Sequence, residues 1–179
     1  MTLVEATYSS GQVAKAIGVN EHTLQTWFKR GLVTGGKNAY LEKPSQMGTR
    51  RRFTFENVVE VAVANALVCL RVPAPVAFRA ARQFAHVGDE HRLPGLPFPD
   101  GPTFLFSSGP RASVIRWCDD TYQMLAAIKR RLGTSEGFIA LDVGPVFDRA
   151  VAGLGLHPQA VIDAAYSGFT GRPEDRNVH

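Results

Sequence analysis

Residues 9–31, SSGQVAKAIGVNEHTLQTWFKRG, contain two short helical patterns separated by a tight turn. Ser9 and Gln12 have the spacing of a capping box, and Gly18 can end the first helix. Asn20 can cap the second helix, because a short polar side chain at that position accepts a hydrogen bond from the first helical turn. Two helices joined through Gly-Val-Asn predict a helix-turn-helix.

The helical period disappears over residues 34–52, TGGKNAYLEKPSQMGTRRR, which are rich in glycine and in cations. The alternation in residues 51–55, RRFTF, is typical of a short strand, so we expect two strands with a flexible tip, forming a β-hairpin wing. Thr54 can then cap an apolar helix over residues 55–71, and a fourth helix is expected over residues 74–88.

Three adjacent arginines, Arg50, Arg51 and Arg52, stand just before the third predicted helix. Adjacent like charges repel one another, and an isolated run of this kind is most simply a solvated loop. In a wing, the repulsion is relieved when each guanidinium neutralises a phosphate and condensed counterions leave. The helix-turn-helix context therefore favours contact with a nucleic-acid backbone.

The charge is distributed unevenly along the 179 residues, whose net charge is +4. Residues 1–87 contain 11 Lys and Arg against 5 Asp and Glu, a balance of +6, whereas residues 88–179 contain 9 against 11, a balance of −2. A basic first half indicates a polyanionic partner. The apolar content of 45% is enough for a packed core.

The order helix, turn, helix, basic wing, helix, helix resembles the winged helix-turn-helix domain of the MerR family of transcription regulators. The segments that carry the resemblance are YSSGQVAKAIGV, HTLQTWFKRGLV and RRFTFENVVEV. The resemblance implies a mainly α protein that binds double-stranded DNA. The positions that follow the family pattern are Thr23, Leu24, Trp27, Gly31, Leu32, Arg51, Phe53 and Val58.

Three positions of the second helix depart from the family pattern: Gln25 replaces the usual arginine, Thr26 an aromatic residue and Phe28 an acidic one. The prolines of residues 94–102 do not allow the long dimerisation helix of full-length members, and the effector-binding cysteines are absent. The resemblance therefore implies DNA binding more directly than ligand-triggered untwisting of a promoter. Shorter relatives among phage and mobile-element regulators and excision factors fit equally well.

The predicted DNA contacts come from the second helix, acting as the recognition helix, and from the wing. His22 and Gln25 can read base edges in the major groove, where glutamine can pair with adenine. Trp27 has helical spacing with Leu24 and Phe28, which favours packing in the core over stacking on bases. The complete predicted set is His22, Thr23, Gln25, Thr26, Lys29 and Arg30 in the helix, and Lys37, Tyr40, Lys43, Arg50, Arg51 and Arg52 in the wing.

Residues 88–102, GDEHRLPGLPFPDGP, are predicted to be a linker between a first domain, 1–87, and a second, 103–168, with a flexible tail over 169–179. In the second domain, TFLFS and ASVIRWC predict a β-hairpin, GFIALDV a third strand, and the last segments two short helices. This small α+β domain is expected to dimerise or to bind another protein. Its DDTYQMLAAIKRRLG segment predicts an amphipathic helix whose apolar stripe is Tyr122, Leu125, Ile128 and Leu132.

The sequence contains no recognisable arrangement for catalysis. His86 and His91 flank Asp89 and Glu90 but fit no strong metal-ligand spacing. The pair Asp119–Asp120 stands where a helix begins, so capping explains it. We expect no catalytic residue, no metal site and no cofactor.

The compartment is expected to be the cytoplasm, because no apolar run approaches the roughly 18 residues of a membrane span and the N-terminus has no secretory pattern. Cys69 and Cys118 lie far apart in the sequence and are expected to be free thiols.

These observations predict a sequence-specific DNA-binding transcriptional regulator, with double-stranded DNA and a second copy of the chain as its partners and no membrane association. A DNA-architectural factor of the excisionase or small-terminase-subunit type is the alternative, because the same domain can bend or organise DNA. An enzyme or an interaction module that does not bind DNA is a third possibility. The operator, the sign of regulation and any effector are left open by the sequence.

Overall fold

The computed structural model describes residues 6–34, 52–109, 111–133 and 137–169. Its first two helices, α1 (Ser10–Ile17) and α2 (Glu21–Lys29), form the predicted helix-turn-helix. The Ser9 hydroxyl accepts a hydrogen bond from the Gln12 amide at 3.3 Å, and the Gln12 side chain accepts one from the Ser9 amide at 2.9 Å. Gly18 ends α1 with φ of 73°, a conformation that glycine adopts without steric cost, and Asn20 caps α2.

A short two-stranded ladder lies beside these helices. Strand β1 (Tyr8–Ser9) pairs antiparallel with β2 (Arg52–Phe53), with Tyr8 opposite Phe53. The predicted strand over residues 51–55 is therefore confirmed at Arg52 and Phe53, whereas Thr54 caps α3 and Phe55 begins it. The rest of the predicted wing lies outside the described residues.

Helix α3 (Phe55–Cys69) is buried on nearly every side, as its sequence of valines and alanines requires. Thr54 caps it, with a hydrogen bond from the Asn57 amide to the Thr54 hydroxyl at 3.3 Å. A tight turn leads to α4 (Ala74–Ala85), which packs along α3.

The second half contains a three-stranded antiparallel sheet in the order β4-β3-β5, formed by β3 (Thr103–Ser107), β4 (Ala112–Arg116) and β5 (Ile139–Asp142). Leu105 and Val114 on one face join the core with α4. Helix α5 (Thr121–Leu132) covers the other face. There it forms a separate small cluster of Phe106, Ile115, Met124, Ile128 and Leu132.

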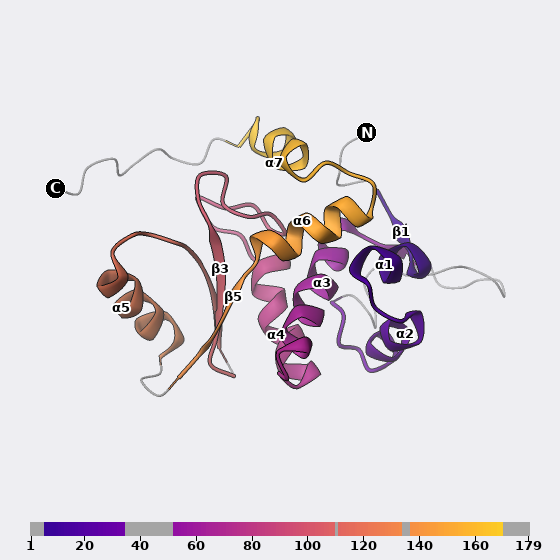
Figure 1. Ribbon diagram of the computed structural model, residues 1–179, viewed down its shortest axis with the longest axis horizontal. Helices are drawn as coiled ribbons and strands as arrows, with labels where there is room; N and C mark the ends of the chain where they lie inside the picture. Colours follow the sequence, from indigo (N-terminus) through magenta and orange to yellow (C-terminus); the bar gives the residue numbers. More distant parts are fainter. Residues whose placement is uncertain (1–5, 35–51, 110, 134–136, 170–179) are drawn as a thin grey trace.

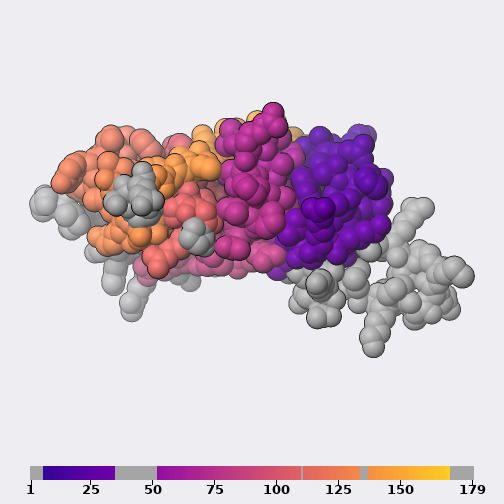
Figure 2. All heavy atoms as spheres, turned by 90° about the horizontal axis from the view of Figure 1, so that it is seen from below, coloured from indigo at the N-terminus to yellow at the C-terminus, as the bar shows by residue number. Residues whose placement is uncertain are grey.

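Helices α6 (Gly144–Gly153) and α7 (Pro158–Tyr166) complete the fold. The chain returns from β5 to the first half, and α6 packs across α1 and α3 (Figure 1). Phe147 of α6 is fully buried, and its ring meets the edge of Phe55 at 6.2 Å between centroids. The view from below shows residues 6–34 at one end of the molecule and α5 with β5 at the other, with α3 and α4 between them (Figure 2).

The residues on both sides of the predicted linker contribute to one hydrophobic core. Leu96 and Phe98 within the linker are buried in this core, together with Val13 of α1 and Val146 of α6. The division into two domains stays a prediction, but the packing shows that the first 87 residues do not enclose the core by themselves.

The linker is an irregular connection held by polar contacts. Arg92 is 2% exposed, and its guanidinium satisfies carbonyl groups at the end of α4, where a positive charge is favourable. Burial lowers the pKa of Arg92, an effect that nearby Asp89 opposes. Tyr166 of α7 accepts a hydrogen bond from the Leu93 amide at 3.0 Å and donates one to the Pro97 carbonyl at 2.9 Å. The carbonyl partners of Arg92 are those of Gln83, Phe84, Val87, Leu93 and Leu96.

The predicted stripe of α5 is wrong at two positions. Tyr122 is 84% exposed and Leu125 is 39% exposed, whereas Met124 is buried beside Ile128 and Leu132. Met124, Ile128 and Leu132 also have helical i, i+4 spacing, so periodicity alone did not distinguish the two flanks of this helix.

We predict that Gly153→Ala destabilises the protein by about 1–3 kcal/mol, because an added Cβ would lie 2.5 Å from the Ala16 carbonyl oxygen and force α6 away from α1. Gly11→Ala is the matched control, since Gly11 lies in α1 with no atom within 4 Å of an added Cβ. This control should stabilise the protein by up to about 1 kcal/mol through helix propensity. Urea unfolding of both variants measures the difference, and equal effects would contradict the packing of α6 on α1.

Candidate nucleic-acid interface

Helix α2 buries one face and leaves the other accessible. Leu24, Trp27 and Phe28 are buried, which fixes the rotation of the helix about its axis. Of the six residues predicted to contact DNA from this helix region, His22, Lys29 and Arg30 are exposed, and Thr23, Gln25 and Thr26 are half-buried. The structure therefore brings the predicted residues of this helix together on its accessible side.

Trp27 lies in the core, as predicted. It is 7% exposed, and its ring meets the edge of Phe78 of α4 at 5.3 Å between centroids. Phe28, which replaces an acidic residue of the family pattern, packs edge-on against Phe53 of β2 at 5.9 Å. The substitution at position 28 thus places an aromatic contact between α2 and the base of the wing.

Thr26 uses its hydroxyl within the helix. The Thr26 Oγ1 donates to the His22 carbonyl one turn earlier, at 2.9 Å. Such a bond occupies the hydroxyl proton and leaves the oxygen lone pairs as acceptors. Thr26 is therefore a weaker candidate for donating to a base or phosphate than Gln25.

In β2, Arg52 is exposed and Phe53 is only 2% exposed. This difference is expected for adjacent residues of a strand that buries one face. Arg52 stands opposite Ser9 in the ladder. Lys37, Tyr40, Lys43, Arg50 and Arg51 lie outside the described residues, so their predicted contacts stay predictions.

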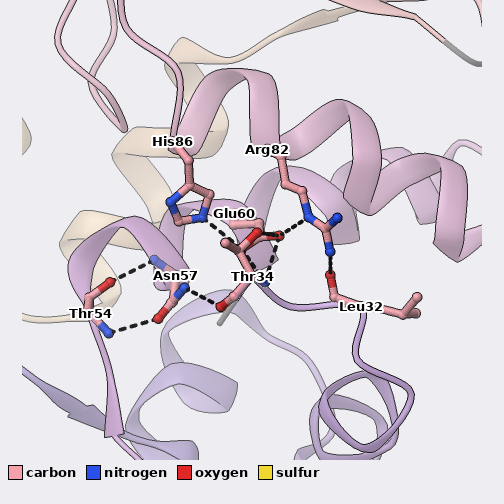
Figure 3. Close-up of polar contacts among 7 residues, drawn as sticks. All are labelled: Leu32, Thr34, Thr54, Asn57, Glu60, Arg82 and His86. Atoms are coloured by element: carbon pink, nitrogen blue, oxygen red, sulfur yellow. Dashed lines mark hydrogen bonds and ion pairs between the residues drawn. The ribbon is translucent and has the colours of Figure 1, made fainter. Parts of the chain in front are cut away.

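A fully buried carboxylate anchors the chain where it leaves α2. Glu60 of α3 has 0% exposure, and its two oxygens accept hydrogen bonds from the Thr34 amide at 3.1 and 2.9 Å and from the Thr34 hydroxyl at 2.9 Å (Figure 3). Arg82 Nε lies 3.3 Å from Oε1 and His86 Nε2 lies 2.9 Å from Oε2. A buried carboxylate is tolerable only with such a set of partners.

Two further hydrogen bonds tie the same segment to α3 and α4 (Figure 3). Asn57 Nδ2 donates to the Thr34 carbonyl at 3.0 Å, and an Arg82 Nη2 donates to the Leu32 carbonyl at 2.7 Å. Asn57 and Glu60 from α3 and Arg82 from α4 thus hold residues 32–34. These residues follow α2 and precede the segment predicted to form the wing. His86, just after α4, contacts Glu60.

Sequence reasoning missed Glu60, although a signal was present. Glu60 is an acidic residue inside FENVVEVAVANALVC, a helix otherwise dominated by valine and alanine. In a helix buried on most sides, such a residue must be paired. His86, for which the sequence indicated no role, is one of the partners of this carboxylate. The prediction for Asp120 is confirmed, because its carboxylate caps α5 by accepting from the Gln123 amide at 3.0 Å.

The described residues contain no group of three or more His, Cys, Asp or Glu placed to hold a metal ion. Cys69 and Cys118 are exposed free thiols, as predicted. In the described part of the chain, no helix is both long enough and apolar enough to cross a membrane.

The fold defines a helix-turn-helix protein in which the short strand β2, with exposed Arg52 and buried Phe53, lies beside the second helix. Residues 8–73 match a protein family described as MerR HTH family regulatory protein. The N-terminal region, from β1 to the turn before α4, is therefore similar to the MerR family, whose members are DNA-binding transcription regulators. A comparison with curated proteins finds none that matches this chain.

We predict that Glu60→Gln lowers the free energy of unfolding by about 1–3 kcal/mol, because the amide group turns a donor toward partners that are themselves donors. Glu56→Gln is the matched control: Glu56 lies one turn earlier on α3 and is half-buried. This control should change stability by less than about 0.5 kcal/mol. Urea unfolding gives both values, and a Glu60 effect as small as the control would show that the carboxylate does not anchor Thr34.

Proposed function

We propose that this protein is a sequence-specific transcriptional regulator that inserts α2 into the major groove of DNA and lays its basic wing on the phosphate backbone. The observation that carries the proposal is the MerR-like match over residues 8–73, which spans the helix-turn-helix and both strands at the base of the wing. The orientation of α2 supports it, since the predicted contact residues share the side opposite Leu24 and Trp27.

The side chains divide into two roles. Gln25 and His22 read base edges, because their donor and acceptor atoms can match the pattern of the major groove. Lys29 and Arg30 at the end of α2, together with the wing cations, contact phosphates and set the register of the protein on the duplex. No residue of this surface is assigned a catalytic role, and we propose that the protein is not an enzyme.

The polar contacts around Glu60, here called the Glu60 cluster, support the same proposal because they fix the segment that follows α2. A recognition helix and a wing read one stretch of DNA only when their mutual position is fixed. The bonds of Glu60, Asn57 and Arg82 to residues 32–34 restrict that position at the point where α2 ends. We expect the protein to act in the cytoplasm as a homodimer on double-stranded DNA, in which two copies read two half-sites.

A DNA-architectural factor is the second candidate, favoured by the altered residues of the recognition helix. Gln25 replaces a cation of the family pattern, and Phe28 replaces an acidic residue and packs against Phe53. A recognition helix with fewer phosphate contacts places more weight on the wing and on DNA shape. Selection of bound fragments from genomic DNA separates the two candidates: promoter sites support the regulator, and recombination or packaging sites support the architectural factor.

We predict that Arg51→Ala weakens binding by a similar factor on specific and non-specific DNA and makes the slope of log affinity against log salt shallower by about 1. Gln25→Ala should leave the slope unchanged and relax the preference at one base pair by about 1–3 kcal/mol. Arg149→Ala, which removes an exposed cation of α6, is the control and should change neither quantity. Fluorescence anisotropy at several salt concentrations measures both, and identical behaviour of the three variants would reject the assigned roles.

A further inference from the structure

Large exposed apolar side chains gather in one part of the molecule. Five of the seven in the described chain lie between residues 117 and 139, far from the helix-turn-helix, while the other two, Leu70 and Val87, follow α3 and α4. A concentration of this kind on a protein surface indicates an interaction site. The five are Trp117 at 37%, Tyr122 at 84%, Leu125 at 39%, Phe138 at 36% and Ile139 at 38% exposed.

Helix α5 is oriented so that part of this apolar surface faces outward. Met124, Ile128 and Leu132 pack on the sheet, and Arg131 Nη1 donates to the Val114 carbonyl of β4 at 3.2 Å, so the Arg131 flank lies toward β4. Successive residues of a helix are rotated by 100°, so residues spaced i, i+3, i+4 and i+7 share one side. One such set lies on the side of α5 that faces away from the sheet and from the Arg131 flank. These residues, here called the α5 stripe, are Tyr122, Leu125, Ala126 and Lys129.

The two ends of α5 carry opposite charges. Asp119 and Asp120 precede the helix, and Lys129, Arg130 and Arg131 form its last turn, all of them exposed. The helix dipole favours this arrangement within a single chain. It does not account for the exposed apolar side chains of the α5 stripe, Tyr122, Leu125 and Ala126, which lie between the two charged ends.

We propose that the α5 stripe is the surface on which a second copy of this chain docks, with the two α5 helices antiparallel. The inference specifies the interface of the homodimer expected under the proposed function. A two-fold axis near Leu125 and Ala126 places Leu125 of each copy against Ala126 of the other, and a small residue opposite a large one allows close approach. The same axis brings Tyr122 of each copy to Lys129 of the other, where an aromatic ring and an ammonium group attract each other.

Charge complementarity selects a second copy as the occupant. An antiparallel pairing sets the acidic end of each α5 beside the basic end of its mate, so that both ends are complementary at once. A parallel pairing would oppose like charges at both ends. A surface that complements itself in this way is the requirement for a two-fold dimer interface. Because α5 lies at the end of the molecule opposite residues 6–34, the docked copy leaves α2 uncovered (Figure 2).

The first test introduces a charge into the apolar stripe. Sedimentation equilibrium of the full chain over a range of concentrations should show a dimer whose association weakens at least about tenfold in Leu125→Glu. Ala164→Glu, at an exposed position of α7, is the matched control and should leave the association unchanged. Thermal unfolding should be similar for the two variants, because both positions are exposed.

The second test determines the direction of the helices. Asp119→Lys alone and Arg130→Glu alone should each weaken the dimer, and the double variant in one chain should restore it, because the exchanged charges again face each other while the contact of Tyr122 with Lys129 is kept. Asp120 is kept, since its carboxylate caps α5. In a parallel pair, each charged residue would face the same residue of the other copy. Neither single change would then add a repulsion, and the double change would not restore a weakened dimer.

A protein that stays monomeric at all concentrations, or a dimer that resists Leu125→Glu, overturns the proposal. The DNA-binding function is judged separately by anisotropy with a short duplex holding a single half-site. Retained binding of that duplex by Leu125→Glu, with loss of the dimer, supports the interface and leaves the DNA-binding surface intact. Loss of DNA binding by the unaltered protein would instead reject the proposed function, while its sedimentation would still decide the interface.

Discussion

The apolar surface of α3 is the constraint on which the rest of this structure depends. Nine of its 15 residues are buried, and they lie on every side of the helix. A helix of this kind is stable in water only when neighbours enclose it, because exposing one face would return its valine side chains to solvent. Helices α1, α4 and α6 supply that enclosure. The helix-turn-helix is therefore one wall of a core that the end of the chain completes.

The same helix carries a charge within this core, and the charge holds the segment that follows α2. Glu60 replaces its water shell with the Thr34 amide and hydroxyl, Arg82 and His86. These donors come from α4 and from the segment that follows α2. Each donor is thereby fixed relative to α3. The position of α2 is thus determined both by Trp27 in the core and by a polar contact just beyond the helix end.

The sequence was most informative where local chemistry decides the structure. Capping residues and the left-handed Gly18 predicted the helix-turn-helix, and alternation predicted the strands, because these signals act over a few residues. The shared core was not predictable from the sequence. The prolines of residues 94–102 indicate an irregular connection, but they do not show that Arg92 fixes this connection to the end of α4 through carbonyl contacts. The stripe of α5 was predicted wrongly at Tyr122 and Leu125, because two sets of residues share the helical period and the period does not say which set meets the sheet. Glu60 was overlooked because its partners come from residues 26 and 22 positions away along the chain.

The packing of α6 on α1 also has a consequence for biosynthesis. A ribosome releases α1, α2 and α3 well before it has made α6, so the nascent regulator exists for a time with one side of its core open to water. Hydrophobic surface exposed in this interval is a substrate for chaperones and a route to aggregation. A message truncated after β5 would yield a product that keeps the MerR-like region of residues 8–73 but lacks the helix that completes the core. Quality control by proteolysis would then remove these incomplete copies.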